Sequence, residues 1–317
     1  MTSKGGLKMT HSIVGVDVSK DWLDAHRRSD GQNRRFPNSK QGRQSLIRWA
    51  GAARVAFEPS GSYHRALERH LAAAGLEAVK INPLQVHRFA EAVGTRAKTD
   101  AVDARLIARM AVQLDLPATP PLDQTILTLK QMQIARQGLV KDRTAARNRA
   151  RGHECPFLKR QAAARIKHVE AQLKALDGEI NALIAGDRIL TSRRDILISI
   201  PGISAVTAAA LLAEAPELGT LDGKAVASLA GLAPINRQSG QWNGRAMIRG
   251  GRAHLRHALY MPALVAARFS RDLKAVYDRL ISAGKPPKVA LTAMMRKLLI
   301  LANALLRDNR SWSQKLA

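Results

Sequence analysis

Four carboxylates stand out in this sequence by their positions. Asp17 ends one short β-rich run, Glu58 directly follows another, and Asp100 and Asp103 are three residues apart. That spacing places the last two on one face of a predicted helix, near its N-terminus. Acids that meet at one edge of a sheet repel one another unless cations lie between them, and oxygen ligands suit Mg²⁺ or Mn²⁺. The pattern favours a metal site for phosphoryl transfer, in which two ions stabilise the attacking and leaving oxygens.

Each of these acids also has an ordinary interpretation. Asp100 is a favourable charge at a helix N-terminus, Glu58 is a loop acid before Pro59, and Asp17 is a turn residue. Taken singly, each is explained without a metal. Taken together, in a protein with 51 basic and only 25 acidic residues, they favour the metal interpretation.

A second chemically informative residue is Ser239, which precedes Gly240 in a polar, glycine-rich segment predicted to be a loop over residues 236–251. A serine hydroxyl is a weak nucleophile unless a base or a metal activates it, and His257 is a conceivable base. A Ser-Gly pair alone is also typical of a plain turn. Nearby guanidinium groups able to clamp phosphate oxygens belong to Arg237, Arg245, Arg249, Arg252 and Arg256.

The charge of the chain points to a polyanionic partner. The formal net charge is +26 and the pI is near 11.2, which favours nucleic acid first and an anionic membrane surface second. Two blocks carry much of the charge: residues 130–168 and residues 236–310. Aromatic residues make up only 4 %, which argues against base stacking as the main binding device. Further candidate contacts to nucleic acid are Lys20 and Lys98, which flank the acids, and Arg143, Arg147 and Arg151 in the first block.

The remaining composition bounds the location. The single cysteine, Cys155, excludes an intrachain disulfide, and the polar N-terminus shows no secretory signal. The sequence contains no run of about 18 apolar residues, so no membrane span is predicted. We therefore expect a cytoplasmic protein without a membrane partner.

Hydrophobic periodicity predicts an α/β region followed by an all-α region. Residues 10–118 are predicted to form a mixed layer with the order β-β-β-α-β-α-β-α-α. Residues 123–190 predict two long basic helices, a coiled-coil-like linker that turns near residues 153–157. Residues 194–312 predict a helical domain that contains the Ser239 loop.

Several motifs together resemble the DEDD transposases of bacterial insertion sequences, a family that includes the Piv-type DNA invertases. The matching segments are Gly15-Val16-Asp17-Val18-Ser19-Lys20, Phe57-Glu58-Pro59-Ser60-Gly61-Ser62-Tyr63, Asn82-Pro83, Lys98-Thr99-Asp100-Ala101-Val102-Asp103-Ala104, Ile200-Pro201-Gly202-Ile203 and the segment around Ser239. The sequence departs from the family pattern at Ser60, Ser204 and Gln238. The last of these stands where an acid often precedes the serine.

The resemblance implies a RuvC-like, RNase H-like N-terminal domain in which Asp17, Glu58, Asp100 and Asp103 hold Mg²⁺ or Mn²⁺. It implies that Ser239 is the nucleophile of a phosphoserine intermediate with DNA. It also implies double-stranded DNA and a structured guide RNA as partners, and a homo-oligomer, a dimer or tetramer, associated with the bacterial nucleoid. The alternatives are a metal-dependent junction nuclease, a DNA invertase without a guide RNA, and a non-catalytic nucleic-acid-binding scaffold.

Overall fold

The computed structural model describes residues 12–59, 61–94, 100–121, 123–240 and 242–313. The chain divides into two compact units, residues 1–122 and residues 123–317. The sequence predicted three regions, residues 10–118, 123–190 and 194–312, and those bounds stay predictions.

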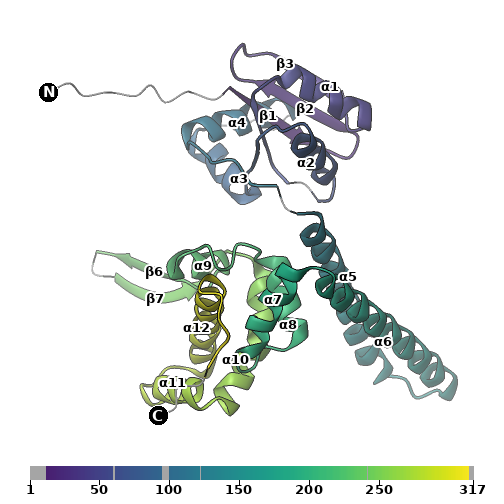
Figure 1. Cartoon of the computed structure of the whole chain (residues 1–317), viewed down its shortest axis with the longest axis vertical. Helices are drawn as coiled ribbons and strands as arrows, with labels where there is room; N and C mark the ends of the chain where they lie inside the picture. Colours follow the sequence, from purple (N-terminus) through teal and green to yellow (C-terminus); the bar gives the residue numbers. More distant parts are fainter. Residues whose placement is uncertain (1–11, 60, 95–99, 122, 241, 314–317) are drawn as a thin grey trace. The chain divides into compact units, whose positions relative to one another are not determined.

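The first unit is built on one five-stranded sheet with the order β3-β2-β1-β4-β5. Figure 1 labels its strands β1, β2 and β3. Strand β1 pairs antiparallel with β2 and parallel with β4; β2–β3 is antiparallel and β4–β5 is parallel. The predicted element order is confirmed, and so is the mixed α/β layer that was predicted for this region. The elements are β1 (Ile13–Val18), β2 (Trp22–Arg27), β3 (Asn33–Pro37), α1 (Lys40–Ala50), β4 (Arg54–Phe57), α2 (His64–Ala73), β5 (Ala78–Lys80), α3 (Pro83–Ala92) and α4 (Asp100–Gln113).

Both faces of this sheet are covered by helices, because the central strands carry apolar side chains on both faces. Val14, Val16 and Phe57 pack with the buried leucines of α1 and α2. Ile13 and Ala56 pack on the opposite face, with the buried residues of α3 and α4. Side chains alternate strictly along a strand, so the parity of a residue number in β1 and β4 tells which face it lies on.

Gly15 allows α4 to lie directly against β1. A Cβ at this position would be 2.1 Å from the carbonyl oxygen of Ala104 and 2.6 Å from the amide nitrogen of Ala108. Both contacts are to backbone, which has no side chain that can turn away. The helix is therefore held at one fixed distance and at one rotation over the α4 face of the sheet.

We expect Gly15→Ala to lower the free energy of unfolding by about 2–3 kcal/mol, because the added methyl group must displace α4. Urea unfolding of the full chain measures this effect. The matched control is Gly138→Ala, since Gly138 lies in a helix with nothing within 4 Å of its added Cβ. Removing that glycine should stabilise the chain by about 0.5–1 kcal/mol. Equal effects of the two substitutions would contradict this account of Gly15.

The second unit is mainly helical and contains one two-stranded hairpin. The loop predicted over residues 236–251 is wrong for most of its length, because this segment forms β6 and β7. The elements are α5 (Gln124–Ala150), α6 (Pro156–Ala185), α7 (Arg188–Ser199), α8 (Ala205–Glu214), α9 (Gly223–Leu229), β6 (Pro234–Ser239), β7 (Trp242–Ile248), α10 (Ala253–Phe269), α11 (Arg271–Ser282) and α12 (Pro287–Arg307).

Helices α5 and α6 form the long antiparallel pair that the sequence predicted (Figure 1). Arg136 joins the two helices through hydrogen bonds of 2.6 and 3.2 Å to Asp177. At the base of the pair, Leu129, Ile180 and Ile184 are buried in the same core as α7, α8, α10 and α12. That packing explains why the pair belongs to the second compact unit.

Among the described residues, α12 is the one helix long and apolar enough to cross a bilayer by length and composition, with a mean hydropathy of 1.7. Ten of its residues are buried in the protein, including Met294, Leu298 and Leu305. The apolar composition of α12 is therefore accounted for by the core of the second unit.

Asx and serine caps fix where several helices begin. Ser39 accepts a hydrogen bond from the amide of Gly42 at the start of α1. Asn82 caps α3, where Pro83 occupies the first turn. Asp222 accepts two amide hydrogen bonds at the start of α9. Each cap satisfies amides that the helix leaves without a carbonyl partner.

Candidate functional site

Asp17 and Glu58 lie at the same end of two adjacent parallel strands. Val16 of β1 is in register with Phe57 of β4, so the next residues along the two strands are Asp17 and Glu58. Both have the parity of Gly15 and Ala56, which places them toward the face that α4 covers. Neighbouring strands are about 4.8 Å apart, so these two half-buried carboxylates are close neighbours on one face.

The other two predicted acids belong to α4, the helix over that face. Asp100 is its first residue, and Asp103 precedes Ala104, whose carbonyl approaches Gly15. Asp103 is half-buried. The side chain of Asp100 and all of Lys98 lie outside the described residues.

The chemistry of these donors fits a hard divalent cation, because every predicted ligand is a carboxylate oxygen. Among the described side chains, no group of three His, Cys, Asp or Glu residues gathers closely enough to hold an ion. The described part of the site is thus the pair Asp17 and Glu58 with Asp103 on the covering helix. A complete set of ligands stays a prediction.

Asn38 joins three loops at the acid end of the sheet, the end at which Asp17 and Glu58 lie. Its backbone amide donates to the carbonyl of Asp21 at 2.8 Å. Its side-chain amide donates to the carbonyls of Ser19 at 2.9 Å and Tyr63 at 3.4 Å. Arg43 in turn donates to the backbone and side-chain oxygens of Asn38 at 2.7 and 2.8 Å. The sequence did not predict this role of Asn38, because its partners are distant in the chain.

Lys20 lies in one of these loops, between Ser19 and Asp21. It is exposed, in the tight turn between β1 and β2. Ser19 closes that turn through its hydroxyl, which donates to the carbonyl of Trp22 at 3.0 Å. Contact of Lys20 with nucleic acid stays a prediction.

Ser239 lies at the tip of the β6–β7 hairpin. It is the last residue of β6 and pairs with Trp242, the first residue of β7. Gly240 has a φ of +56°, which is typical of the tight turns that close such hairpins. Ser239 is exposed, so its hydroxyl is accessible to a large substrate. The side chains of Arg237, Trp242 and Arg245 lie outside the described set, and His257 is exposed on α10.

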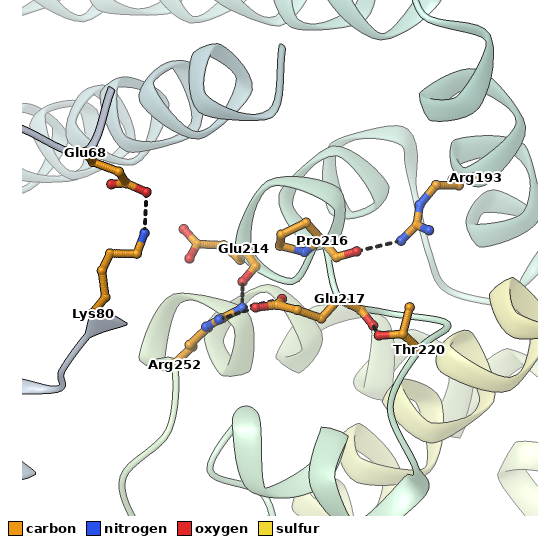
Figure 2. A network of polar contacts seen from close by, with 8 residues as sticks. All are labelled: Glu68, Lys80, Arg193, Glu214, Pro216, Glu217, Thr220 and Arg252. Carbon is orange, nitrogen blue, oxygen red and sulfur yellow. Dashed lines mark hydrogen bonds and ion pairs between the residues drawn. The ribbon is translucent and has the colours of Figure 1, made fainter. Parts of the chain in front are cut away.

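Two of the five arginines predicted to clamp phosphate make hydrogen bonds within the protein near the base of the hairpin. Arg252 donates to both carboxylate oxygens of Glu217, at 2.8 and 2.6 Å, and to the carbonyl of Glu214 at 2.6 Å, as Figure 2 shows. Arg256 donates to the carbonyls of Ala230 at 3.0 Å and Gly250 at 2.8 Å. These hydrogen bonds support the base of the hairpin, and contact of Arg252 and Arg256 with nucleic acid stays a prediction. Arg249 is exposed.

The backbone segments at the hairpin base approach each other without intervening side chains. A Cβ on Gly231 would be 2.1 Å from the carbonyl oxygen of Gly250, and one on Gly251 would be 2.1 Å from the amide nitrogen of Gly231. All three glycines have positive φ angles. The base is therefore fixed by close backbone packing and two arginines, while the tip that carries Ser239 is exposed.

The Arg252–Glu217 pair should make stability depend on pH. Burial alone would raise the pKa of Glu217, but hydrogen bonds from Arg252 hold the pKa below its ordinary value. A carboxyl group whose pKa is lowered by folding stabilises the fold at pH values above its ordinary pKa, about 4.3. This stabilisation is lost as the pH falls through the folded-state pKa. We expect Glu217→Gln to lower stability by about 1 kcal/mol at pH 7 and to have a much smaller effect at pH 3.

Thermal unfolding at both pH values measures this difference. The matched control is Glu170→Gln, which removes an exposed ion pair with Arg147 on the α5–α6 pair. The control should change stability little at either pH. An effect of Glu217→Gln that does not depend on pH would contradict an ion pair at the hairpin base.

The predicted basic contacts in residues 130–168 differ in their surroundings. Arg143 is half-buried, Arg147 is paired with Glu170, and Arg151 is exposed at the end of α5. Contact with nucleic acid stays a prediction for all three.

The Pro201-Gly202 turn is a packing junction. Gly202 has a φ of +91°, and a Cβ there would be 2.6 Å from the carbonyl oxygen of Pro262 in α10. Ser204 caps α8 by accepting from the amide of Thr207 at 3.3 Å. The turn therefore fixes α7 and α8 against α10.

An RNase H-like sheet with carboxylates at its strand ends, followed by a helical unit with an exposed serine, is the architecture expected of a DNA-recombining enzyme. Comparisons with known proteins make this assignment specific. Residues 14–153 match a transposase family, and residues 194–278 match the transposase IS116/IS110/IS902 family. The first match includes all four acids, and the second includes Ser239.

Similarity extends along the whole chain. The pilin gene-inverting protein of Moraxella bovis is 31 % identical over 326 residues, covering 97 % of this chain and 99 % of that protein. The insertion element IS110 43.6 kDa protein of Streptomyces coelicolor is 30 % identical over 156 residues, covering 49 % of this chain and 38 % of that protein. The chain belongs to the IS110-type family of transposases and DNA invertases, and it is a DNA recombinase by that membership.

Proposed function

We propose that this recombinase breaks and rejoins DNA with two cooperating centres, a metal-binding acid site and the hydroxyl of Ser239. The observation that carries the proposal is the register of Asp17 and Glu58 at the ends of adjacent parallel strands. Asp103, on the helix over that face, and Asp100 complete the proposed set of ligands. When bound, Mg²⁺ or Mn²⁺ would stabilise the charge that develops on the phosphate oxygens.

The proposed serine step conserves bonds. The Oγ atom of Ser239 forms a bond to phosphorus, the phosphodiester bond to one deoxyribose oxygen breaks, and that oxygen takes up a proton. The hydroxyl proton of Ser239 passes to a base or to water. A hydroxyl of another DNA end then attacks the phosphoserine, which releases Ser239 and forms the new phosphodiester. No external energy source is needed, because one ester is exchanged for another.

The experiment that tests this function is a recombination assay in cells. The gene would be cloned with its native flanks, and the junctions of an excised circle and of an inverted segment would be amplified separately. A junction that depends on the intact gene supports recombination by this chain. Expressed protein without either junction, in a host that supports a related element, would count against it.

Inversion is the second candidate outcome. It is favoured by the similarity to a pilin gene-inverting protein over 97 % of this chain. The same assay separates the two reactions, since excision gives a circular junction and inversion gives two reversed ones.

A guide RNA is a further part of the proposal. A net charge of +26 supports binding of a second polyanion beside DNA. Pairing between RNA and DNA would supply sequence specificity that the protein does not need to read. RNA that co-purifies with the chain, maps beside the gene and is required for recombination would support this part. Full activity after RNase treatment would overturn it without affecting the serine mechanism.

We also propose that the chain acts as a homo-oligomer on nucleoid DNA. The main competing mechanism is that of a metal-only nuclease. In that alternative, water attacks at the acid site and Ser239 only shapes the hairpin.

A further inference from the structure

A row of charged residues crosses three strands beside Asp17. Asp24 of β2 is directly opposite Asp17, and Arg35 of β3 is directly opposite Asp24. Residues that are directly opposite on antiparallel strands share a face of the sheet. The neighbours Leu23, Ala25 and Phe36 pack into the core of the other face, which confirms the alternation. The row therefore lies on the face that carries the acid site.

The arginine in this row is held in one orientation. Its Nε and Nη2 atoms donate to the two carboxylate oxygens of Asp24 at 2.8 and 3.0 Å. Its guanidinium carbon lies 5.6 Å from the centre of the Trp22 ring. The Asp24 side chain is 13 % exposed, whereas that of Arg35 is 50 % exposed and Trp22 is 44 % exposed. A nearly buried carboxylate thus positions an exposed cation beside an exposed aromatic ring.

Position along the strands places this pair at the acid end of the sheet. Trp22 is the first residue of β2, which begins where β1 ends, and it has the parity of Asp24. Strands β1 and β3 are separated only by β2, a distance of about 10 Å. A nucleotide next to a phosphodiester bound at Asp17 and Glu58 is within reach of this pair.

Stability alone does not account for the arrangement. Exposed ion pairs contribute about 0–1 kcal/mol, and two carboxylates directly opposite each other, as Asp17 and Asp24 are, destabilise a sheet. A ring that is 44 % exposed also leaves much apolar area in water. For binding a nucleotide, the fixed guanidinium of Arg35 and the exposed ring of Trp22 are favourable. A fixed guanidinium loses little conformational entropy when it contacts phosphate, and an exposed indole stacks on a base of any identity.

We propose that Trp22 and Arg35 form a nucleotide subsite for an unpaired stretch of the DNA strand that enters the acid site. The indole stacks on a base, Arg35 contacts a phosphate, and Asp24 is a positioning residue that orients Arg35. The subsite's place beside the reacting phosphodiester rests on the proposed function, whereas its ability to bind a nucleotide does not. A single stacking residue is compatible with an aromatic content of only 4 %.

Tryptophan fluorescence of the full-length protein tests the subsite directly. A short single-stranded DNA would be added in EDTA, so that no metal-dependent reaction occurs, at one fixed salt concentration. We expect quenching in the wild type, loss of part of that quenching in Trp22→Phe, and binding weaker by about 5- to 100-fold in Trp22→Ala. Arg35→Lys keeps the positive charge but removes the planar guanidinium group that donates two parallel hydrogen bonds. Asp24→Asn removes the carboxylate that holds Arg35 in one orientation. Both should weaken binding while stacking on Trp22 continues to quench.

The matched control is Trp49→Phe, because Trp49 also has an arginine, Arg27, over its ring, at 4.6 Å, but packs against the core of the other face. It should leave binding unchanged, and far-UV circular dichroism would confirm that each variant is folded. Quenching and affinity in the Trp22 variants within twofold of the wild type would overturn the proposal. Equal quenching of Trp22 by duplex DNA would overturn the unpaired strand, and quenching only by an RNA oligonucleotide would overturn DNA as the occupant.

Asp17→Asn separates this inference from the proposed function. It removes a negative charge near the strand, so quenching of Trp22 in EDTA should be kept or strengthened. If Asp17→Asn recombines normally, the acid-site mechanism fails while the subsite stands. If it is inactive and Trp22 is not quenched in any variant, the subsite fails while the acid site stands.

Discussion

Ser239→Ala is expected to abolish strand joining, with a loss of at least about 10³-fold, since removal of a catalytic nucleophile typically costs that much or more. The alanine variant keeps the hairpin, whose base is held by Arg252, Arg256 and close glycine packing. Recombination junctions in cells measure the loss. Denaturing gels measure the second expected change, which is the disappearance of covalent protein–DNA adducts.

The control is Ser282→Ala, which removes an exposed serine at the end of α11 and should recombine normally. Junctions at wild-type levels in Ser239→Ala would contradict the serine mechanism. Retained cutting without joining or adducts would instead support a metal-only nuclease, in which water is the nucleophile at the acid site.

Asp17→Asn and Glu58→Gln are each expected to lower strand cleavage by about 10²–10⁴-fold, a range typical of lost electrostatic stabilisation of a transition state. The amides match the carboxylates in size, so packing at the strand ends should be kept. Cleavage of a labelled DNA, followed as Mg²⁺ is titrated, measures the effect. A neutralised ligand should also raise the Mg²⁺ concentration needed for half-maximal rate.

Asp21→Asn is the matched control, since Asp21 is an exposed carboxylate in the turn that follows Asp17. It should leave both the rate and the Mg²⁺ dependence unchanged. Asp17 and Glu58 are neighbours in register, so the double variant should lose little more than either single one. Additive losses would argue that the two acids act independently and not on one metal centre.

The sequence predicted the sheet and its acids because the signals involved are local. The runs that became β1 and β4 are short and β-rich; Asp17 is the penultimate residue of β1, and Glu58 directly follows β4. In β1 and β4 the side chains on both faces of the sheet are apolar. Hydrophobic patterning therefore did not predict the face on which Asp17 and Glu58 lie. It became clear only when Val16 and Phe57 were found in register and Gly15 was found against α4.

The features that the sequence did not predict depend on partners far apart in the chain. The ion pair of Arg252 is one of them, because its partner Glu217 is 35 residues away. Asn38 contacts Ser19 and Tyr63 across separations of 19 and 25 residues. The β6–β7 hairpin was predicted to be a loop because its polar, glycine-rich composition conceals the pairing. Such contacts carry no local signal.

The contact between Gly15 and α4 has a consequence for how sequences of this kind can change over time. One residue inserted in α4 between Asp100 and Ala104 would turn Asp100 by about 100° around the helix axis, while the backbone of Ala104 remained against β1. Insertions before Asp100 would have no such effect. Chain length before the helix can thus change, whereas Gly15 and the spacing of residues 100, 103, 104 and 108 should be inherited as one block. Any replacement of Gly15 would demand a compensating change in the helix above it.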